Sequence, residues 1–150
     1  MDIILFQPQI PQNTGNIVRT CSITNSNLIL VRPLGFSVTQ RQLKRAGLDY
    51  WDEVCITQID DLQAYLEKEK RPFYFFSSKA EKKYSDISYT KDDILIFGSE
   101  TSGLPLFLNG LYPDHFVTIP MKTGVRCLNL SNAVAVGLFE AFRQIDFDFG

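Results

Sequence analysis

The sequence has few of the side chains on which many catalytic and metal sites depend. His115 is its only histidine, which leaves little material for a Ser-His-Asp triad or for a metal site built from several histidines. The three cysteines, Cys21, Cys55 and Cys127, are odd in number, widely spaced and free of any CxxC pair. This usage argues against a disulfide framework and predicts a protein of a reducing compartment, the cytoplasm, with no bound metal.

Long apolar runs, phosphate-binding fingerprints and an excess of basic charge are also missing. No apolar run reaches the roughly 18–20 residues that cross a bilayer, and neither GxGxxG nor GxxxxGK[ST] occurs. The opening MDIILFQPQIPQ has an acid at position 2 and no basic region, so it predicts a strand rather than a signal peptide. The formal net charge of −2 does not indicate nucleic-acid binding, although it leaves room for a local basic face.

What the chain does contain is an alternation of strand-like and helix-like segments over one expected domain, residues 1–150. Six continuous apolar runs predict parallel strands covered on both faces: Ile3–Phe6, Leu28–Val31, Val54–Thr57, Phe73–Phe76, Ile94–Phe97 and Phe116–Ile119. Helical patterns lie between and after them, at Thr14–Asn25, Thr39–Ala46, Asp60–Lys70 and from about Asn129 onward. The polar stretch Lys79–Asp93 is predicted to be an exposed loop. This order predicts an α/β fold with a mostly parallel sheet flanked by helices.

In open α/β sheets ligands bind beyond the carboxyl ends of the strands, and three stretches with unusual residues fall there. The first is Pro11–Arg19, after the first predicted strand. Asn13 can cap the following helix, Gly15 permits close approach of a ligand, and Arg19 lies about one turn further along. The residues alone are equally compatible with an anion site and with a capping turn beside a solvated arginine.

The second stretch is Phe97–Leu104, which directly follows a predicted strand. Gly98 and Gly103 surround a lone Glu100, and this pattern predicts backbone folded tightly against a ligand. The carboxylate can take part in chemistry there or cap a neighbouring helix, and both interpretations stay open.

The third stretch, Ile119–Arg143, joins a basic loop to a helix. Asn129 and Ser131 predict the helix start, because their side-chain oxygens satisfy free N–H groups. The helix is apolar around most of its circumference, which predicts burial against its own sheet on one side and a second subunit on the other. In the loop, Lys122 and Arg126 can meet phosphates, although the residues alone favour a plain loop before a core helix over a ligand site.

The same loop contains main-chain groups that can hold an adenine edge, at Ile119 and at Cys127–Leu128. Cys127 follows an arginine, yet a buried and inert cysteine is the simpler interpretation than an activated thiolate.

Together the three stretches resemble the three motifs of the SPOUT superfamily of RNA methyltransferases. The matching segments are NTGNIVR at 13–19, FGSETSGLP at 97–105 and IPMKTGVRCLNLSNAVAVGLFEAFRQ at 119–144. KRAGLDYW at 44–51 also resembles a segment of one subgroup, the short tRNA (cytidine/uridine-34-2′-O)-methyltransferases. The resemblance is specific, since three motifs occur in order at matching spacing over nearly the whole chain.

This resemblance implies a deep trefoil knot in the C-terminal part, a homodimer, and S-adenosyl-L-methionine (AdoMet) bound in a bent form by the knot loops. Composition and spacing do not predict a knot, because protein chains rarely form one. The cofactor contacts that the resemblance implies are Phe76, Gly98, Glu100, Ile119, Cys127, Leu128 and Asn129. The catalytic residues that it implies are Arg19 and Arg126.

The implied activity is methylation of the ribose 2′-hydroxyl of wobble nucleotide 34 in tRNA, with the anticodon loop bound. A guanidinium stays protonated, so we expect Arg19 to orient the ribose and stabilise the developing alkoxide rather than to act as a base. The side chains expected to contact RNA are Arg32, Arg41, Lys44, Arg45 and Lys122.

Three alternatives stay open at this point. They are the same reaction on another tRNA or ribosomal RNA site, a non-catalytic RNA-binding module on this fold, and a flavodoxin-like or Rossmann-like nucleotide binder. Two positions also depart from the subgroup: Cys127 stands where serine is usual, and Phe139 where tyrosine is frequent. A role that needs a hydroxyl is therefore not carried over to either position, while the motif arginines are present.

Overall fold

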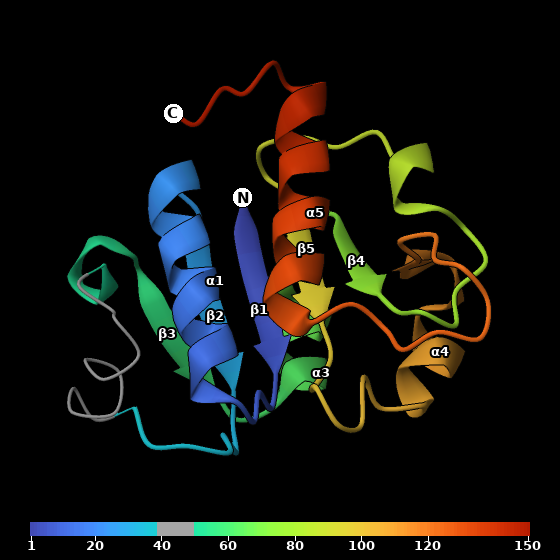
Figure 1. Ribbon diagram of the computed structural model, residues 1–150, viewed down its shortest axis with the longest axis horizontal. Helices are drawn as coiled ribbons and strands as arrows, with labels where there is room; N and C mark the ends of the chain where they lie inside the picture. Colours follow the sequence, from blue (N-terminus) through green and yellow to red (C-terminus); the bar gives the residue numbers. More distant parts are fainter. Residues whose placement is uncertain (39–49) are drawn as a thin grey trace.

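A computed structural model describes residues 1–38 and 50–150, and six parallel strands form its sheet. The strands are β1 Asp2–Phe6, β2 Asn27–Val31, β3 Ile56–Ile59, β4 Phe73–Phe76, β5 Ile94–Phe97 and β6 Phe116–Val117. Their order is β3-β2-β1-β5-β4-β6, and all five neighbouring pairs run parallel (Figure 1). The predicted α/β fold with a parallel sheet is confirmed.

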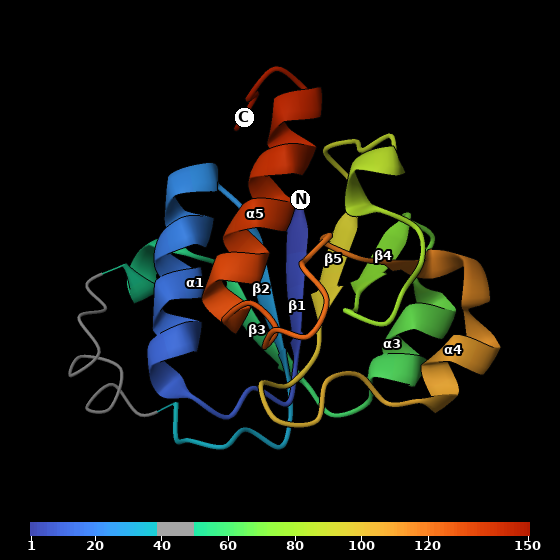
Figure 2. The same cartoon turned by 45° about the vertical axis from the view of Figure 1, so that its right-hand side comes forward.

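Helices cover both faces of this sheet (Figures 1 and 2). The α-helices are α1 Pro11–Thr24, α3 Leu62–Lys68, α4 Phe107–Leu111 and α5 Leu130–Gln144, and the short 3-10 helices are η1 Trp51–Glu53, η2 Tyr84–Asp86 and η3 Pro113–His115. Helices α1 and α5 lie side by side on one face, whereas α3 and α4 lie on the other. Among the described residues no helix is both long enough and apolar enough to span a membrane.

Apart from Asp2 at the start of β1, the central strands β1 and β5 are apolar at every position, because alternate side chains enter two different cores. Ile3 and Leu5 of β1 belong to the cluster beneath α1 and α5, while Ile4 between them belongs to the cluster beneath α3. In β5, Leu95 belongs to the cluster beneath α1 and α5, and Ile96 belongs to the cluster beneath α3. Side chains along a strand point alternately to opposite faces, so a sheet covered on both sides needs such unbroken apolar runs.

Several element boundaries differ from the sequence prediction. Helix α1 begins at Pro11 rather than Thr14, since proline lacks the N–H that the first helical turn leaves unbonded. The third strand begins at Ile56 rather than Val54 and is partly exposed, as its position at the sheet edge dictates. Helix α4 was not predicted. The predicted helix Thr39–Ala46 lies outside the described residues.

The stretch Lys79–Asp93 is not simply the exposed loop that was predicted. Ile87 and Tyr89 are buried in the core beneath α5, and Asp93 is fully buried. The Tyr89 hydroxyl donates to the carbonyl oxygen of Tyr84 at 2.8 Å. Much of the stretch is therefore packed onto the domain, although its composition is polar.

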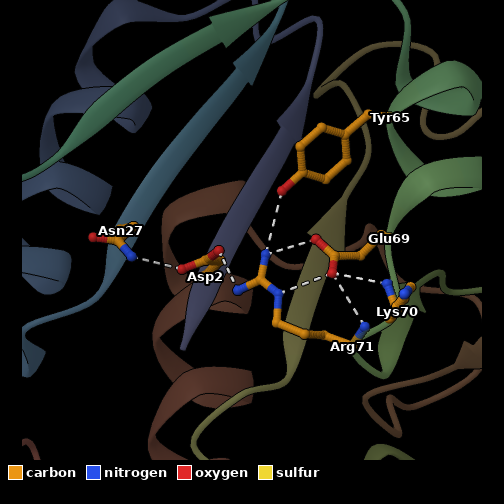
Figure 3. A network of polar contacts seen from close by, with 6 residues as sticks. All are labelled: Asp2, Asn27, Tyr65, Glu69, Lys70 and Arg71. Carbon is orange, nitrogen blue, oxygen red and sulfur yellow. Dashed lines mark hydrogen bonds and ion pairs between the residues drawn. The ribbon is translucent and has the colours of Figure 1, made fainter.

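A polar network joins α3, β4 and β1 at the amino edge of the sheet (Figure 3). The Arg71 guanidinium donates to Asp2 at 2.7 Å, to Glu69 at 2.7 and 3.1 Å, and to the Tyr65 hydroxyl at 3.3 Å. Asn27 at the start of β2 donates to the second oxygen of Asp2 at 2.8 Å. This network lies at the opposite edge from the carboxyl ends of the strands, and it fixes the start of the central strands.

Candidate active site

A cavity of about 800 Å³ opens at the carboxyl edge of the sheet, beyond β4 and β5. Its volume lies within the usual range for sites that take small molecules and cofactors. Eight of the predicted site residues line it: Phe76, Gly98, Glu100, Ile119, Arg126, Cys127, Leu128 and Asn129. These residues come from three separate parts of the sequence, which the parallel sheet brings to one edge.

Gly98 allows the loop after β5 to fold back tightly. A Cβ at this position would lie 2.4 Å from the carbonyl carbon of Gly103 and 2.6 Å from the backbone nitrogen of Leu104, so no larger residue fits. Ser99 and Gly103 exchange two backbone hydrogen bonds of 3.2 and 2.9 Å, and Gly103 has φ +66°. The prediction of tightly folded backbone around the two glycines is confirmed.

The Glu100 carboxylate caps the start of α1 from the side of the neighbouring loop. It accepts hydrogen bonds from the backbone N–H of Gln9 at 2.8 Å and of Ile10 at 3.1 Å, and from the Asn13 side chain at 3.2 Å. The helix-capping interpretation of Glu100 is thus confirmed, and the carboxylate also lines the cavity.

The prediction that Asn13 caps α1 is wrong. Asn13 lies inside the helix, whose N-cap is Ile10, and it is buried. Its amide nitrogen donates to Glu100, and its amide oxygen accepts from the Asn129 side chain at 2.9 Å. The physical reason is that proline already begins the helix at position 11, which frees the asparagine to join two other segments.

Asn129 is the N-cap of α5, as predicted. Its side-chain oxygen accepts from the backbone N–H groups of Ser131 at 2.9 Å and Asn132 at 3.4 Å, and from the Ser131 hydroxyl at 2.6 Å. One chain of hydrogen bonds, from Glu100 through Asn13 to Asn129, therefore links all three motif stretches. Each stretch holds the other two in place around the cavity.

The wall toward α5 is aromatic and closely packed. Phe76 and Phe97 end adjacent strands and stack with ring centroids 4.5 Å apart. A Cβ at Gly137 in α5 would lie only 2.8 Å from the ring of Phe76. The helix can approach these rings because position 137 has no side chain, so α5 sets where the aromatic wall lies.

The loop before α5 presents backbone to the cavity. In the described part of the chain, the peptide groups of Cys127 and Leu128 have no hydrogen-bond partner. Unpaired N–H and C=O groups on a cavity wall are suited to a ligand edge that both donates and accepts, such as adenine. The prediction of a buried Cys127 is wrong: the residue is exposed, because it lies on the cavity wall rather than under the helix.

The cations predicted for catalysis and RNA binding are not gathered in one place. Arg126 is exposed and lines the cavity. Arg19 is exposed on α1 outside the cavity, where its guanidinium lies 5.5 Å from the ring centroid of Tyr50. Arg32 pairs with Asp60 at 2.8 Å.

Of the four remaining predicted RNA contacts, the structure describes Lys122. Lys122 is exposed on the loop before α5 but does not line the cavity. Arg41, Lys44 and Arg45 lie outside the described residues.

Sequence reasoning missed part of the cavity wall. The side chains that it did not single out include Ser77, Ser78, Lys79, Leu104, Leu106 and Met121. Their position gives the available signal, since each lies shortly after a strand or within a loop at the carboxyl edge. Among the described residues, no group of three or more His, Cys, Asp or Glu side chains is placed to hold a metal ion.

The cavity has features that fit the adenosyl part of AdoMet. The aromatic pair suits apolar parts of the cofactor, the unpaired peptide groups suit the adenine edge, and the tight turn at Gly98 lets backbone come close. Fold and cavity together define a parallel α/β protein with a cofactor-sized site built from three loops at the carboxyl edge of its sheet.

Comparison with known proteins identifies the group within this class. Residues 1–139 match the model of the SpoU rRNA Methylase family, and the chain belongs to that family. It is 48% identical over 149 residues to a putative tRNA (cytidine(34)-2′-O)-methyltransferase of Listeria monocytogenes, covering 97% of this chain and 88% of the relative.

Two further matches agree with it. A tRNA (cytidine(34)-2′-O)-methyltransferase of Yersinia pestis is 43% identical over 154 residues, covering 98% of this chain and 95% of the relative. A solved structure concerned with 2-OH methylation of C/U34 on tRNA superposes with a TM-score of 0.86 at 41% identity, covering 97% of this chain and 95% of the other.

Proposed function

We propose that this protein transfers a methyl group from AdoMet to the ribose 2′-hydroxyl of nucleotide 34 in tRNA. The observation that carries the proposal is one cavity lined by all seven residues expected to hold the cofactor and by Arg126. Relatives that are 43% and 48% identical over nearly the whole chain, and whose names state this reaction, support the choice of substrate. Like the three free cysteines, this activity is consistent with a cytoplasmic protein.

The residues that would hold AdoMet have distinct tasks. The peptide groups of Cys127 and Leu128 would bind the adenine edge. Gly98 would let backbone approach the rest of the molecule, and Ile119 would contact it from the facing loop. When bound, the cofactor supplies a methyl group already activated by its sulfonium. The protein has mainly to place the attacking oxygen in line with that methyl group, and such positioning accounts for much of the rate increase in reactions of this kind.

Arg126 lines the cavity in its own chain and is suited to hold the ribose or an adjacent phosphate. Arg19 is the residue expected to orient the ribose and to stabilise the alkoxide, yet it lies outside the cavity of its own chain. We therefore include a homodimer in the proposal, with Arg19 supplied to each cavity by the second subunit. The exposed apolar side chains Val136 and Phe139 on α5 support such an interface, since they leave one face of the helix unburied.

The trefoil knot that the family implies also belongs to this proposal. Ser77 bonds to the carbonyl of Val117, and Tyr84 bonds to the carbonyl of Thr118. Successive carbonyls of an extended chain point to opposite sides, so the segment between Ser77 and Tyr84 passes around the end of β6. A loop around the chain just before the cofactor loop is what a threaded C-terminal part requires.

The test is methyl transfer from labelled AdoMet to total tRNA from cells that lack the mark, followed by mapping of the labelled nucleotide. Label at position 34 is expected, and label elsewhere or none refutes the proposal.

An arginine variant then separates catalysis from cofactor binding. Arg19→Ala should lower the transfer rate by about 10²-fold or more while leaving AdoMet affinity in calorimetry nearly unchanged, because the lost interaction forms in the transition state. Lys68→Ala, which removes an exposed cation from the end of α3 near the amino edge of the sheet, is the control. Equal losses of transfer rate in both variants would count against the role of Arg19. A wild type that binds AdoMet but transfers no methyl group would indicate a non-catalytic RNA-binding module.

A further inference from the structure

The segment Ser77–Tyr84 begins at the cavity wall, but none of its residues has a task in the cofactor binding proposed above. We call it the lysine segment, because it contains Lys79, Lys82 and Lys83 beside a single acid, Glu81. It leaves β4 at the carboxyl edge of the sheet, and its first three residues, Lys79 among them, line the cavity. None of these lysines was among the expected RNA contacts.

The backbone of the lysine segment is held by the sheet at both ends. Ser77 donates to the carbonyl of Val117 at 2.9 Å. Further along, Thr118 donates to the carbonyl of Lys82 at 2.8 Å, and its own carbonyl accepts from Tyr84 at 2.9 Å. The segment thus extends the sheet beyond β6, and the backbone that carries its lysines is fixed at both ends. Binding to a fixed backbone avoids the entropic cost of ordering a loop.

The lysine charges are not neutralised within the described part of the protein. Lys79, Lys82 and Lys83 are all exposed, and none forms an ion pair with another described residue. The cations that do form ion pairs there are Arg32, Arg71, Lys91 and Arg143. Even after Glu81 is counted, the segment has a surplus of positive charge on a chain whose formal net charge is −2.

The arrangement of these charges points to the kind of anion that they meet. Lys79 lies at the cavity, whereas Lys82 and Lys83 lie beyond the last strand, so the cations follow the carboxyl edge outward from the reaction site. AdoMet has one carboxylate and a net positive charge, so it needs no such row. The phosphates of an RNA strand are regularly spaced anions, and lysines in a row bind them without reading sequence.

We propose that the lysine segment binds the phosphate backbone of tRNA beside the nucleotide whose ribose enters the cavity. This inference rests on the function proposed above. It assigns RNA binding to the β4–β6 side of the cavity, in addition to Arg32 on the β2 side. The target nucleotide is then held between two phosphate-binding regions on one edge of the sheet.

The experiment measures tRNA affinity of the full chain by fluorescence anisotropy over a series of salt concentrations. The variant Lys82→Ala/Lys83→Ala should weaken binding by about tenfold at low salt. It should also flatten the slope of log affinity against log salt by about 1.4 to 2, because each lost phosphate contact removes released counterions. Its AdoMet affinity in calorimetry should equal that of the wild type, which also shows that it folds.

The matched control is Lys68→Ala/Lys70→Ala, which removes two exposed lysines near the amino edge of the sheet. If the two double variants lose affinity equally, or if neither does, the lysine segment is not an RNA contact.

A third variant, Lys79→Ala, should weaken tRNA binding and leave AdoMet binding intact. The reverse result would assign Lys79 to the cofactor carboxylate and overturn its place in the proposal. A wild-type protein that binds no tRNA would overturn this proposal together with the proposed function, whereas normal methylation with unaffected variants would overturn this proposal alone.

Discussion

Glu69 shows how one side chain at the amino edge makes stability depend on pH. Its carboxylate accepts from the Arg71 guanidinium and from the backbone N–H groups of Lys70 and Arg71. These hydrogen bonds, led by that from the Arg71 side chain, lower the pKa of Glu69 from 4.5 to about 2. A carboxyl group whose pKa is lower in the folded state stabilises the fold above its unfolded pKa. That contribution is lost as the pH falls toward the folded value.

We therefore predict that Glu69→Gln lowers the free energy of unfolding at pH 7 by about 1–2 kcal/mol, a modest figure because solvent screens the partly exposed Arg71. The variant should also lose less stability than the wild type between pH 4.5 and pH 2. Urea unfolding at several pH values measures both effects. Glu67→Gln on the exposed side of α3 is the control, and a pH dependence of Glu69→Gln identical to that of the wild type would contradict the prediction.

At the residue scale, local sequence rules predict a side chain well when its partners are close along the chain. Asn129 was predicted as a cap because the N–H groups that it accepts from lie within three residues. Asn13 was misjudged because its partners are Glu100 and Asn129, far away in the sequence. The exposure of Cys127 depends likewise on the cavity, which exists only once three segments have come together.

At the element scale, helix α5 fixes the position of the aromatic wall of the cavity. The absence of a side chain at Gly137 lets the helix lie against Phe76 and Phe97, the rings that end two neighbouring strands. Phe76 lines the cavity, so any displacement of its ring changes the shape of the cavity. A glycine inside a helix lowers helix propensity, and close packing of α5 on the sheet offsets that cost here.

The corresponding prediction concerns Gly137→Ala. A Cβ 2.8 Å from Phe76 forces the ring or the helix to move, which should destabilise the protein by about 1–3 kcal/mol and weaken AdoMet binding several-fold. Thermal unfolding and calorimetry measure the two effects. Gly110→Ala in α4, where a Cβ meets nothing within 4 Å, should leave both unchanged. AdoMet affinity of Gly137→Ala equal to that of the wild type would show that the helix does not position the ring.

At the element scale, the buried strands and α5 could be predicted, because apolar runs and helix caps are local signals. The edge strand β3 and the short helix α4 could not be placed correctly. The bounds of β3 depend on its neighbour in the sheet, and those of α4 depend on the loop that leads to β6. The sequence pattern of both segments is weak. The packed stretch from Lys79 to Asp93 was mistaken for a loop since its few buried side chains are separated by polar ones.

For the whole molecule, the α/β class followed from the alternation of segments, but the position of Arg19 relative to the cavity did not. Spacing places Arg19 about one turn beyond Gly15 within the first motif, which is compatible with a site in the same chain. In the structure its guanidinium lies over Tyr50, outside the cavity. Because Arg19 lies outside the cavity, the proposed function requires either a different role for this arginine or a second subunit that supplies it.

The last prediction decides between those two possibilities. In light scattering at micromolar concentration, the wild type should have twice the chain mass of 17.1 kDa. Phe139→Lys places a charge on the exposed apolar face of α5 and should give monomers that still bind AdoMet. These monomers should transfer methyl groups at least about 10²-fold more slowly, because Arg19 of one subunit no longer reaches the cavity of another. Leu111→Lys, an exposed apolar residue of α4 on the opposite face, should stay dimeric and active. A monomeric wild type, or a monomeric Phe139→Lys with full activity, would exclude a subunit-shared site and require a different role for Arg19.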